Sequence, residues 1–329
     1  MKFAIVGAGA IGAIHAQSIL DNPRASLAVV CDVDPGAASR LAEPQDAVVV
    51  TELDEVLALA PDALIVASST ASHGDVALAA IRANIPFLCE KPLAFDLETA
   101  VEIAEKAAAR GIKAATAFNR RFDVQYSAIK AAVDGDKIGR PEVVNIVSRT
   151  ARPPMPEFIP SSGGLLAEKG SHFYDLARWI CGEDPSEVFV MGSVLIDPGY
   201  GDVGEVDTAK ILLRMPSGTL CQLDFSWRAA YGQDERIEVH GAGGMICTRQ
   251  NPTGPVVHQT ADGLIHPGKL PGWQERFADT YRAELDAFID LIEGGDESSV
   301  LAGLPDGLAT QCIAEACKRS LNDNRPVSL

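Results

Sequence analysis

Residues 2–12 have the sequence KFAIVGAGAIG, in which an apolar run leads directly into the pattern G-x-G-x-x-G. The run Lys2–Val6 predicts a buried strand, and the stretch from Ile11 to Leu20 predicts a helix that begins inside the glycine loop. This alternation continues to about residue 120, which predicts a doubly wound parallel sheet with helices on both faces. The further strand candidates are Ala25–Cys31, Ala47–Val50, Ala63–Ala67, Phe87–Cys89 and Ala114–Ala117, and the helix candidates are 53–59, 74–83 and 97–109.

The glycine loop predicts a site for a dinucleotide. Gly7 permits a tight turn, Gly9 lets the backbone approach a pyrophosphate, and Gly12 lets the helix pack closely on the strand. The N-terminus of the helix offers amide groups and a positive dipole to the phosphates. We therefore expect the cofactor to contact Gly7, Gly9, Ala10, Ile11 and Gly12.

Asp32 indicates which dinucleotide binds. It follows the second predicted strand, about 20 residues after Gly12. A carboxylate at this place accepts hydrogen bonds from both hydroxyls of the adenine ribose and repels a 2′-phosphate, so we expect NAD rather than NADP. Two alternatives stay open: FAD, for which the chain is short, and a glycine-rich turn that binds nothing.

A second domain follows. We predict an NAD-binding Rossmann domain at residues 1–120 and, at residues 121–329, an α+β domain for substrate binding and oligomerisation. Turns at Pro216-Ser217-Gly218 and Gly241-Ala242-Gly243-Gly244 join neighbouring strands, which predicts a largely antiparallel open sheet. The strand candidates are 143–149, 187–196, 208–214, 219–227, 237–239 and 245–248, and the helix candidates are 122–133, 171–180, 273–293 and 303–321.

Composition excludes several classes of function. The 329-residue chain has a formal net charge of −17, which disfavours binding to nucleic acid or to anionic membranes. Its apolar runs are too short to cross a bilayer, and we expect a soluble, cytoplasmic protein without a leader. Seven scattered cysteines without a C-x-x-C pair predict neither a disulfide framework nor a zinc site. We predict no metal site, because His15, His240, His258 and His266 lack ligand spacing.

Two segments carry residues suited to proton transfer. Cys89-Glu90-Lys91-Pro92 ends a predicted strand, where open α/β sheets present ligand-binding groups. Further on, Glu168, His172 and Asp175 fall at i, i+4 and i+7, so they share one face if the segment is helical. A histidine, with an ordinary pKa of about 6.5, suits the removal of a proton from a hydroxyl group.

Taken together, these segments resemble the Gfo/Idh/MocA oxidoreductases, and within that family the inositol 2-dehydrogenase branch. The resemblance covers essentially the whole chain. It rests on the glycine loop, Ser69-Thr70 with His73, Glu90-Lys91-Pro92, residues 118–123, the segment from Gly163-Gly164 to His172, and residues 206–209, 228–232 and 306–308.

The resemblance implies roles for individual residues. Lys91 would hydrogen-bond the reacting part of the substrate and relay a proton, His172 would be the general base, and Glu168 would orient His172 and bind a substrate hydroxyl. The residues expected to contact the cofactor are Ser69, Thr70, His73, Glu90 and Lys91, in addition to the glycine loop and Asp32. Those expected to contact the substrate are Lys91, Asn119, Glu168, Lys169, His172 and Tyr231.

One position departs from the inositol branch, which usually has Asp followed by an uncharged residue where this chain has Glu168-Lys169. The extra methylene and the added ammonium change which hydroxyl or acidic groups the pocket favours.

We therefore expect NAD-dependent oxidation of a cyclitol, myo-inositol or an isomer, to the ketone. Three alternatives stay open: a sugar dehydrogenase or reductase of the same fold, an NAD-dependent glycosidase, and a non-catalytic dinucleotide sensor. We also expect a homotetramer or homodimer, because few helices are available to cover both faces of the second sheet.

Overall fold

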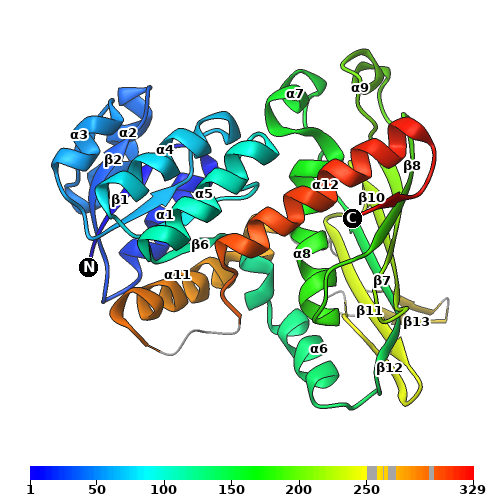
Figure 1. Cartoon of the computed structure of the whole chain (residues 1–329). Coiled ribbons are helices and arrows are strands. Elements are labelled where there is room, and N and C mark those ends of the chain that lie inside the picture. The colour runs from blue at the N-terminus through cyan, green and yellow to red at the C-terminus, as the bar shows by residue number, and fades with distance from the viewer. Residues whose placement is uncertain (250–257, 262, 266–271, 296–299) are drawn as a thin grey trace. The chain divides into compact units, whose positions relative to one another are not determined.

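The computed structural model describes residues 1–249, 258–261, 263–265, 272–295 and 300–329. The chain divides into two compact units. The first contains Met1–Phe122 and Ala278–Cys312, and the second contains Asp123–Phe277 and Ile313–Leu329. Figure 1 shows the elements of both units.

The first unit is built on a parallel sheet with the strand order β3-β2-β1-β4-β5-β6. The order reverses between β1 and β4, which gives the topological switch point of a doubly wound fold. The strands are β1 (Lys2–Val6), β2 (Ser26–Cys31), β3 (Val48–Val50), β4 (Ala63–Val66), β5 (Phe87–Cys89) and β6 (Ala114–Thr116). The helices are α1 (Ala10–Leu20), α2 (Pro35–Ala42), η1 (Glu43–Gln45), α3 (Leu53–Ala58), α4 (Thr70–Ala83), α5 (Leu97–Arg110), η2 (Asn119–Phe122) and α11 (Ala278–Glu293).

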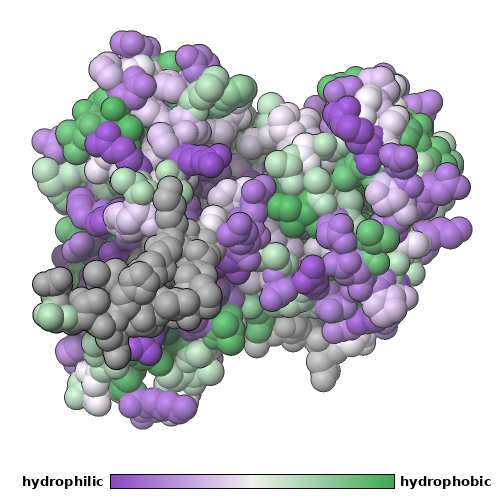
Figure 2. Space-filling view, turned by 180° about the vertical axis from the view of Figure 1, so that it is seen from behind, coloured by the Kyte–Doolittle hydropathy of each residue, from purple (hydrophilic) through white to green (hydrophobic). Residues whose placement is uncertain are grey.

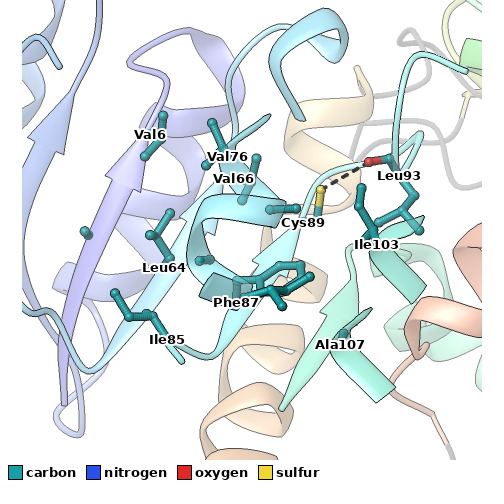
Figure 3. Close-up of a cluster of buried hydrophobic side chains, with 14 of the residues drawn as sticks. Val6, Leu64, Val66, Val76, Ile85, Phe87, Cys89, Leu93, Ile103 and Ala107 are labelled. Carbon is teal, nitrogen blue, oxygen red and sulfur yellow. Dashed lines mark hydrogen bonds between the residues drawn. The ribbon is translucent and has the colours of Figure 1, made fainter. Parts of the chain in front are cut away.

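Both faces of this sheet are buried, as the apolar strands predict. On one face, Phe87 packs with Leu64 and with Ile103 of α5 in the cluster drawn in Figure 3. On the opposite face, Phe3 and Phe288 belong to a second cluster that includes residues of α1 and α11. Residues 278–312 therefore pack with the first unit, whereas the predicted division at residue 120 gave them to the second domain.

The second unit contains a mixed sheet with the strand order β12-β11-β7-β10-β9-β8-β15. β7 and β10 pair in parallel, and the other neighbouring strands pair antiparallel, which confirms a largely antiparallel sheet. The strands are β7 (Pro141–Arg149), β8 (Glu187–Ser193), β9 (Thr208–Arg214), β10 (Leu220–Ser226), β11 (Asp234–Gly241), β12 (Gly244–Cys247) and β15 (Val327–Ser328); β13 (His258–Thr260) and β14 (Gly263–Ile265) pair separately.

Helices α6 and α8 lie along one face of this sheet (Figure 1). The helices of the unit are α6 (Val124–Asp134), η3 (Pro156–Phe158), α7 (Ile159–Ser162), η4 (Leu165–Lys169), α8 (Gly170–Cys181), α9 (Pro198–Asp202) and α10 (Trp273–Arg276), and α12 (Leu304–Asp323) belongs partly to each unit. On the other face of the sheet, side chains such as Met191, Leu212 and Leu220 are exposed.

Several boundaries differ from the predicted ones for physical reasons. Helix α2 was not among the predicted helices, because Pro35-Gly36 resembles a helix breaker; Pro35 is its first residue, and Asp34 caps it by accepting from the amide of Gly36. The strand predicted over 187–196 ends at Ser193, because the amides of residues 195–197 donate to the carboxylate of Asp207. The single helix predicted over 273–293 is interrupted at Phe277.

Among the described residues, no helix is both long and apolar enough to span a bilayer. On the face of the molecule shown in Figure 2, hydrophobic residues lie in small groups among hydrophilic ones.

The buried cluster gives a test of the first unit's core. We expect Phe87→Ala to lower the free energy of unfolding by about 3–5 kcal/mol, because it removes a ring from a site without solvent exposure. Phe95→Ala is the matched control, since Phe95 is 55% exposed and its loss should change stability by about 0.5 kcal/mol or less. Denaturant unfolding followed by circular dichroism measures both values. Equal losses in the free energy of unfolding for the two variants would contradict the burial of Phe87 in this core.

Candidate functional site

The glycine loop combines two close contacts with one open position. A Cβ atom on Gly12 would lie 2.0 Å from the carbonyl oxygen of Gly7, and one on Gly7 would lie 2.4 Å from backbone atoms of Ala67. Both glycines are therefore required by the packing of α1 and β4 around the loop. A Cβ on Gly9 would meet no described atom within 4 Å, and Gly9 is exposed at the N-cap of α1. The loop thus leaves room at Gly9 for a pyrophosphate, with Ala10 and Ile11 beginning the helix beside it.

Asp32 lies beside this loop, immediately after β2. Its Oδ2 accepts a hydrogen bond from the amide of Ala8 at 2.6 Å, and its Oδ1 accepts one from the amide of Asp34 at 2.9 Å. These two bonds hold the carboxylate in place and still leave lone pairs for ribose hydroxyls. The arrangement fits the adenine ribose of NAD and opposes a 2′-phosphate.

The turn from β4 into α4 carries Ser69, Thr70 and His73. Ser69 is the N-cap residue and Thr70 the first residue of α4, so the helix begins earlier than the predicted Gly74. His73 is buried, with Nδ1 2.8 Å from the carbonyl oxygen of Pro92 and Nε2 3.1 Å from that of Ser68. Burial lowers the pKa of His73, although both carbonyl oxygens favour the protonated ring. Through these contacts His73 links the β4–α4 turn to the segment after β5.

Glu90 and Lys91 follow β5 directly. Glu90 is buried, and its Oε1 lies 2.8 Å from Nε2 of His15, while Lys91 is half-buried. Burial by itself would raise the pKa of Glu90, but the hydrogen bond with His15 and nearby positive charges outweigh it and hold the pKa below its ordinary value. Sequence reasoning left His15 unassigned, because its partner lies 75 residues away and no local motif joins the two.

Asn119 lies inside the first unit. Its Nδ2 donates to Oγ1 of Thr280 at 2.8 Å, its Oδ1 accepts from Arg120 at 3.1 Å, and only 1% of the residue is exposed. The amide group therefore joins η2 to α11 rather than facing solvent.

In the second unit, the segment before His172 has an unexpected geometry. Residues Leu165–Lys169 form a π-helical turn, and α8 begins only at Gly170, so Glu168 and His172 do not belong to one unbroken α-helix. Such π-turns occur frequently at functional sites. His172 lies buried in the first turn of α8, and Glu168 is half-buried.

Lys169 is buried, and its ammonium group is held by neighbouring side chains. Nζ donates to Oγ1 of Thr150 at 2.6 Å and to Oγ of Ser148 at 3.0 Å, and it lies 4.9 Å from the centroid of the Trp227 ring. These contacts attach the π-turn to the end of β7.

Tyr231 lies on the other face of the same sheet. Its hydroxyl donates to Asp234 at 2.6 Å and accepts from Arg149 at 3.2 Å. Arg149 and Ser148 are consecutive residues of β7, so their side chains point to opposite faces. The contacts therefore do not bring Tyr231 together with Lys169.

Asp175, the third residue of the expected helical face, is fully buried, and its Oδ1 lies 4.0 Å from Nη1 of Arg178. The described residues contain no cluster of three or more His, Cys, Asp or Glu side chains arranged for a metal ion. His266 and the side chain of His258 lie outside the described part of the chain.

Both units match known protein families. Residues 1–118 match the oxidoreductase family with an NAD-binding Rossmann fold, and residues 126–247 match the GFO/IDH/MocA C-terminal domain. The six-stranded order found among the described residues of the first unit agrees with the Rossmann assignment.

Full-length relatives give the same assignment. The chain is 34% identical over 330 residues to the inositol 2-dehydrogenase of Rhizobium meliloti (strain 1021), covering 100% of this chain and 99% of the relative. It is 35% identical over 331 residues to the myo-inositol 2-dehydrogenase of Thermotoga maritima, covering 100% and 98%. The crystal structure of scyllo-inositol dehydrogenase from Lactobacillus casei with bound NAD(H) and scyllo-inositol superposes with a TM-score of 0.91 at 27% identity, covering 100% and 98%.

The position of Asp32 gives a test of nucleotide choice. We expect Asp32→Asn to lower the preference for NAD over NADP by about tenfold or more, because it removes the charge that opposes the 2′-phosphate. Fluorescence titration with each oxidised nucleotide measures the two dissociation constants. Asp34→Asn is the control, since Asp34 caps α2. An unchanged ratio in Asp32→Asn would contradict the role of this carboxylate.

Proposed function

Because the chain belongs to the Gfo/Idh/MocA family of NAD-binding oxidoreductases, we propose that it oxidises a secondary hydroxyl of a cyclitol, myo-inositol or an isomer, to the ketone. The observation that carries this proposal is full-length identity of 34–35% to two relatives that are both named as inositol 2-dehydrogenases. The structural likeness to an enzyme with bound scyllo-inositol supports the same substrate class.

The proposed reaction needs a hydride acceptor, which NAD supplies when bound. Gly9, Ala10 and Ile11 would hold the pyrophosphate, and Asp32 the adenine ribose. The open space at Gly9 and the fixed carboxylate of Asp32 support this assignment. Ser69 and Thr70, at the start of α4, and Glu90 and Lys91, after β5, follow the strands of the second half of the sheet. Since the cofactor lies at the carboxyl ends of the strands in this fold, we assign these residues to its nicotinamide half.

Two side chains would act on the reacting hydroxyl. His172 accepts the proton of the reacting hydroxyl through its imidazole, and Lys91 donates a hydrogen bond to the same oxygen, which becomes the carbonyl oxygen of the product. Glu168 accepts a hydrogen bond from a neighbouring substrate hydroxyl. The placement of His172 in the first turn of α8, directly after the π-turn that carries Glu168, supports this division of roles.

Lys169 has a different part in this proposal. Its ammonium donates to the hydroxyls of Ser148 and Thr150, which ties the π-turn to the end of β7. We therefore assign Lys169 to fixing the π-turn, so that the carboxylate of Glu168 is the group that selects among substrate hydroxyls.

An activity screen tests the function. We expect formation of NADH, followed by its absorbance, with at least one of myo-, scyllo- and chiro-inositol, and weaker activity with NADP. Lys91→Ala and His172→Ala should each lower kcat by about 10²–10⁴-fold, because each removes a group that contacts the reacting oxygen.

Matched controls are Lys106→Ala and His240→Ala, whose parent side chains are exposed and distant from these segments in sequence. Activity on aldoses alone would favour the sugar dehydrogenase alternative. Cleavage of a glycoside without net formation of NADH would favour the glycosidase. No activity on any polyol would overturn the proposal.

We also propose that the chain forms a homodimer or homotetramer in the cytoplasm. All seven cysteines lie in described parts of the chain, and their scattered positions without a C-x-x-C pair support a reducing compartment. Support for self-association comes from the open face of the second sheet, where Phe189 and Leu212 are cross-strand partners and Arg214 pairs with Glu187. The exposed apolar side chains of this face suit the core of an interface, and its charged pairs suit a polar rim.

Light scattering coupled to gel filtration tests the self-association. We expect a mass that is a multiple of 34.8 kDa, and a shift towards the single-chain mass in Leu212→Glu, which places a charge in the centre of the open face. Leu59→Glu is the control, since Leu59 is similarly exposed but belongs to the first unit. A wild-type protein that runs as a monomer would contradict this part of the proposal.

A further inference from the structure

The hydrogen-bonded pair of His15 and Glu90 lies in the interior of the first unit. His15 has no solvent exposure and Glu90 has 7%, and Nε2 of His15 is 2.8 Å from Oε1 of Glu90. The pair joins the second turn of α1, the helix that follows the glycine loop, to the carboxyl end of β5. A buried ion pair or charged hydrogen bond of this kind adds little net stability compared with apolar packing, which indicates a role other than holding the fold.

The groups around the pair keep the carboxylate of Glu90 ionised. On its own segment, Lys91 follows it directly, and the amide of Lys91 donates to Oε2 at 3.3 Å. From α4, the ring of His73 acts in the same direction, although burial lowers the pKa of His73 itself. Although burial opposes these effects, the pKa of Glu90 lies below its ordinary value, so the carboxylate carries its charge at neutral pH.

The remaining neighbours come from α11 and η2. The ring of Tyr281 lies edge-on to His15 with 5.4 Å between centroids, and burial raises the pKa of the Tyr281 hydroxyl, with Glu90 and Glu284 acting in the same direction. Arg120 opposes this effect through its charge and a hydrogen bond to Tyr281. Tyr281 therefore stays neutral, and it contributes no charge to the pair.

Only one nitrogen of the His15 ring has a hydrogen-bond partner among the described residues. Nδ1 is buried and has no hydrogen-bond partner among the described residues. A neutral ring that donates from Nε2 leaves only a lone pair at Nδ1, whereas a doubly protonated ring would bury an unpaired N–H group. The hydrogen bond at Nε2 therefore orients the carboxylate of Glu90.

Strand order places this charge in the nicotinamide half of the unit. Asp32 and the glycine loop belong to β1 and β2 on one side of the switch point, while Glu90 follows β5 on the other side. In doubly wound folds the two halves of a dinucleotide lie on the two sides of that point. The nicotinamide ring is positively charged in NAD and neutral in NADH, so a carboxylate in a low-dielectric interior interacts differently with the two forms.

We propose that His15 is a positioning residue that holds Glu90 as an oriented carboxylate, and that this pair makes the site prefer oxidised over reduced nicotinamide. The inference rests on the use of NAD in the proposed function, and it does not depend on the polyol. Product NADH is released more readily from such a site, which favours turnover in the direction of oxidation.

Nucleotide binding without any polyol tests the pair. Dissociation constants for NAD and NADH are measured by calorimetry near pH 7.5 for the wild type, Glu90→Gln, His15→Leu and His15→Gln. We expect Glu90→Gln to weaken the binding of NAD relative to that of NADH by about tenfold, because the substitution removes one charge and keeps the side-chain volume. His15→Leu should give a similar shift, because a buried carboxylate without its donor takes up a proton.

His15→Gln is the rescue variant, because its amide can still donate to Glu90, and we expect it to keep most of the preference. The double variant Glu90→Gln/His15→Leu should change the ratio of the NAD and NADH dissociation constants no more than Glu90→Gln alone. In His15→Leu the preference should return as the pH rises and vanish as the pH falls, since the pKa of Glu90 is raised in that variant and the carboxylate is ionised only above it.

If the ratio of the dissociation constants for NAD and NADH is the same in Glu90→Gln as in the wild type, the inference is overturned and the pair has a structural role alone. If His15→Leu does not fold, the comparison of Glu90→Gln with His15→Gln, both close in volume to the wild type, decides the question. Wild-type discrimination between NAD and NADH without activity on any polyol would overturn the proposed function and leave this inference standing.

Discussion

The close approach of α1 to the end of β1 is the constraint on which the first unit depends. Only a residue without Cβ fits at Gly12, where the helix passes the carbonyl oxygen of Gly7. Because the helix is held there, the amide of Ala8 reaches the carboxylate of Asp32, and the next turn of the same helix carries His15 to Glu90. One packing contact therefore positions groups on both sides of the switch point of the sheet.

Several polar side chains in the interior of the first unit are bonded across elements. Arg121 of η2 pairs with Asp306 at 3.2 Å, and Asn119 bonds to Thr280 of α11. Such pairs give little stability over well-packed apolar residues, but loss of one partner is costly because the other stays buried. They fix the segment that follows β6 relative to α11 and α12.

The sequence predicted the first sheet well because its strands are apolar on both faces and end at glycines or polar residues. Phe87–Cys89, for example, has the predicted bounds, and Asp32 follows its strand as expected. Contacts between distant residues were not predictable from spacing: nothing near His15 indicates Glu90, and the return of residues 278–312 to the first unit depends on tertiary packing. The π-turn at Leu165–Lys169 was also missed, since helical periodicity does not distinguish a π-turn from an α-helical one.

The alternation of side chains along β7 separates the predicted substrate residues of the second unit into two groups. Ser148 points to the face that carries α8 and binds Lys169, and Arg149 points to the open face and binds Tyr231. A residue cannot change faces without a shift of register, which would move every buried side chain of the strand into solvent. We infer that Glu168 and His172, on the helix-covered face, are the groups of this unit that act on the substrate. Tyr231 belongs with the open face, where its contacts to Arg149 and Asp234 order the surface proposed for self-association.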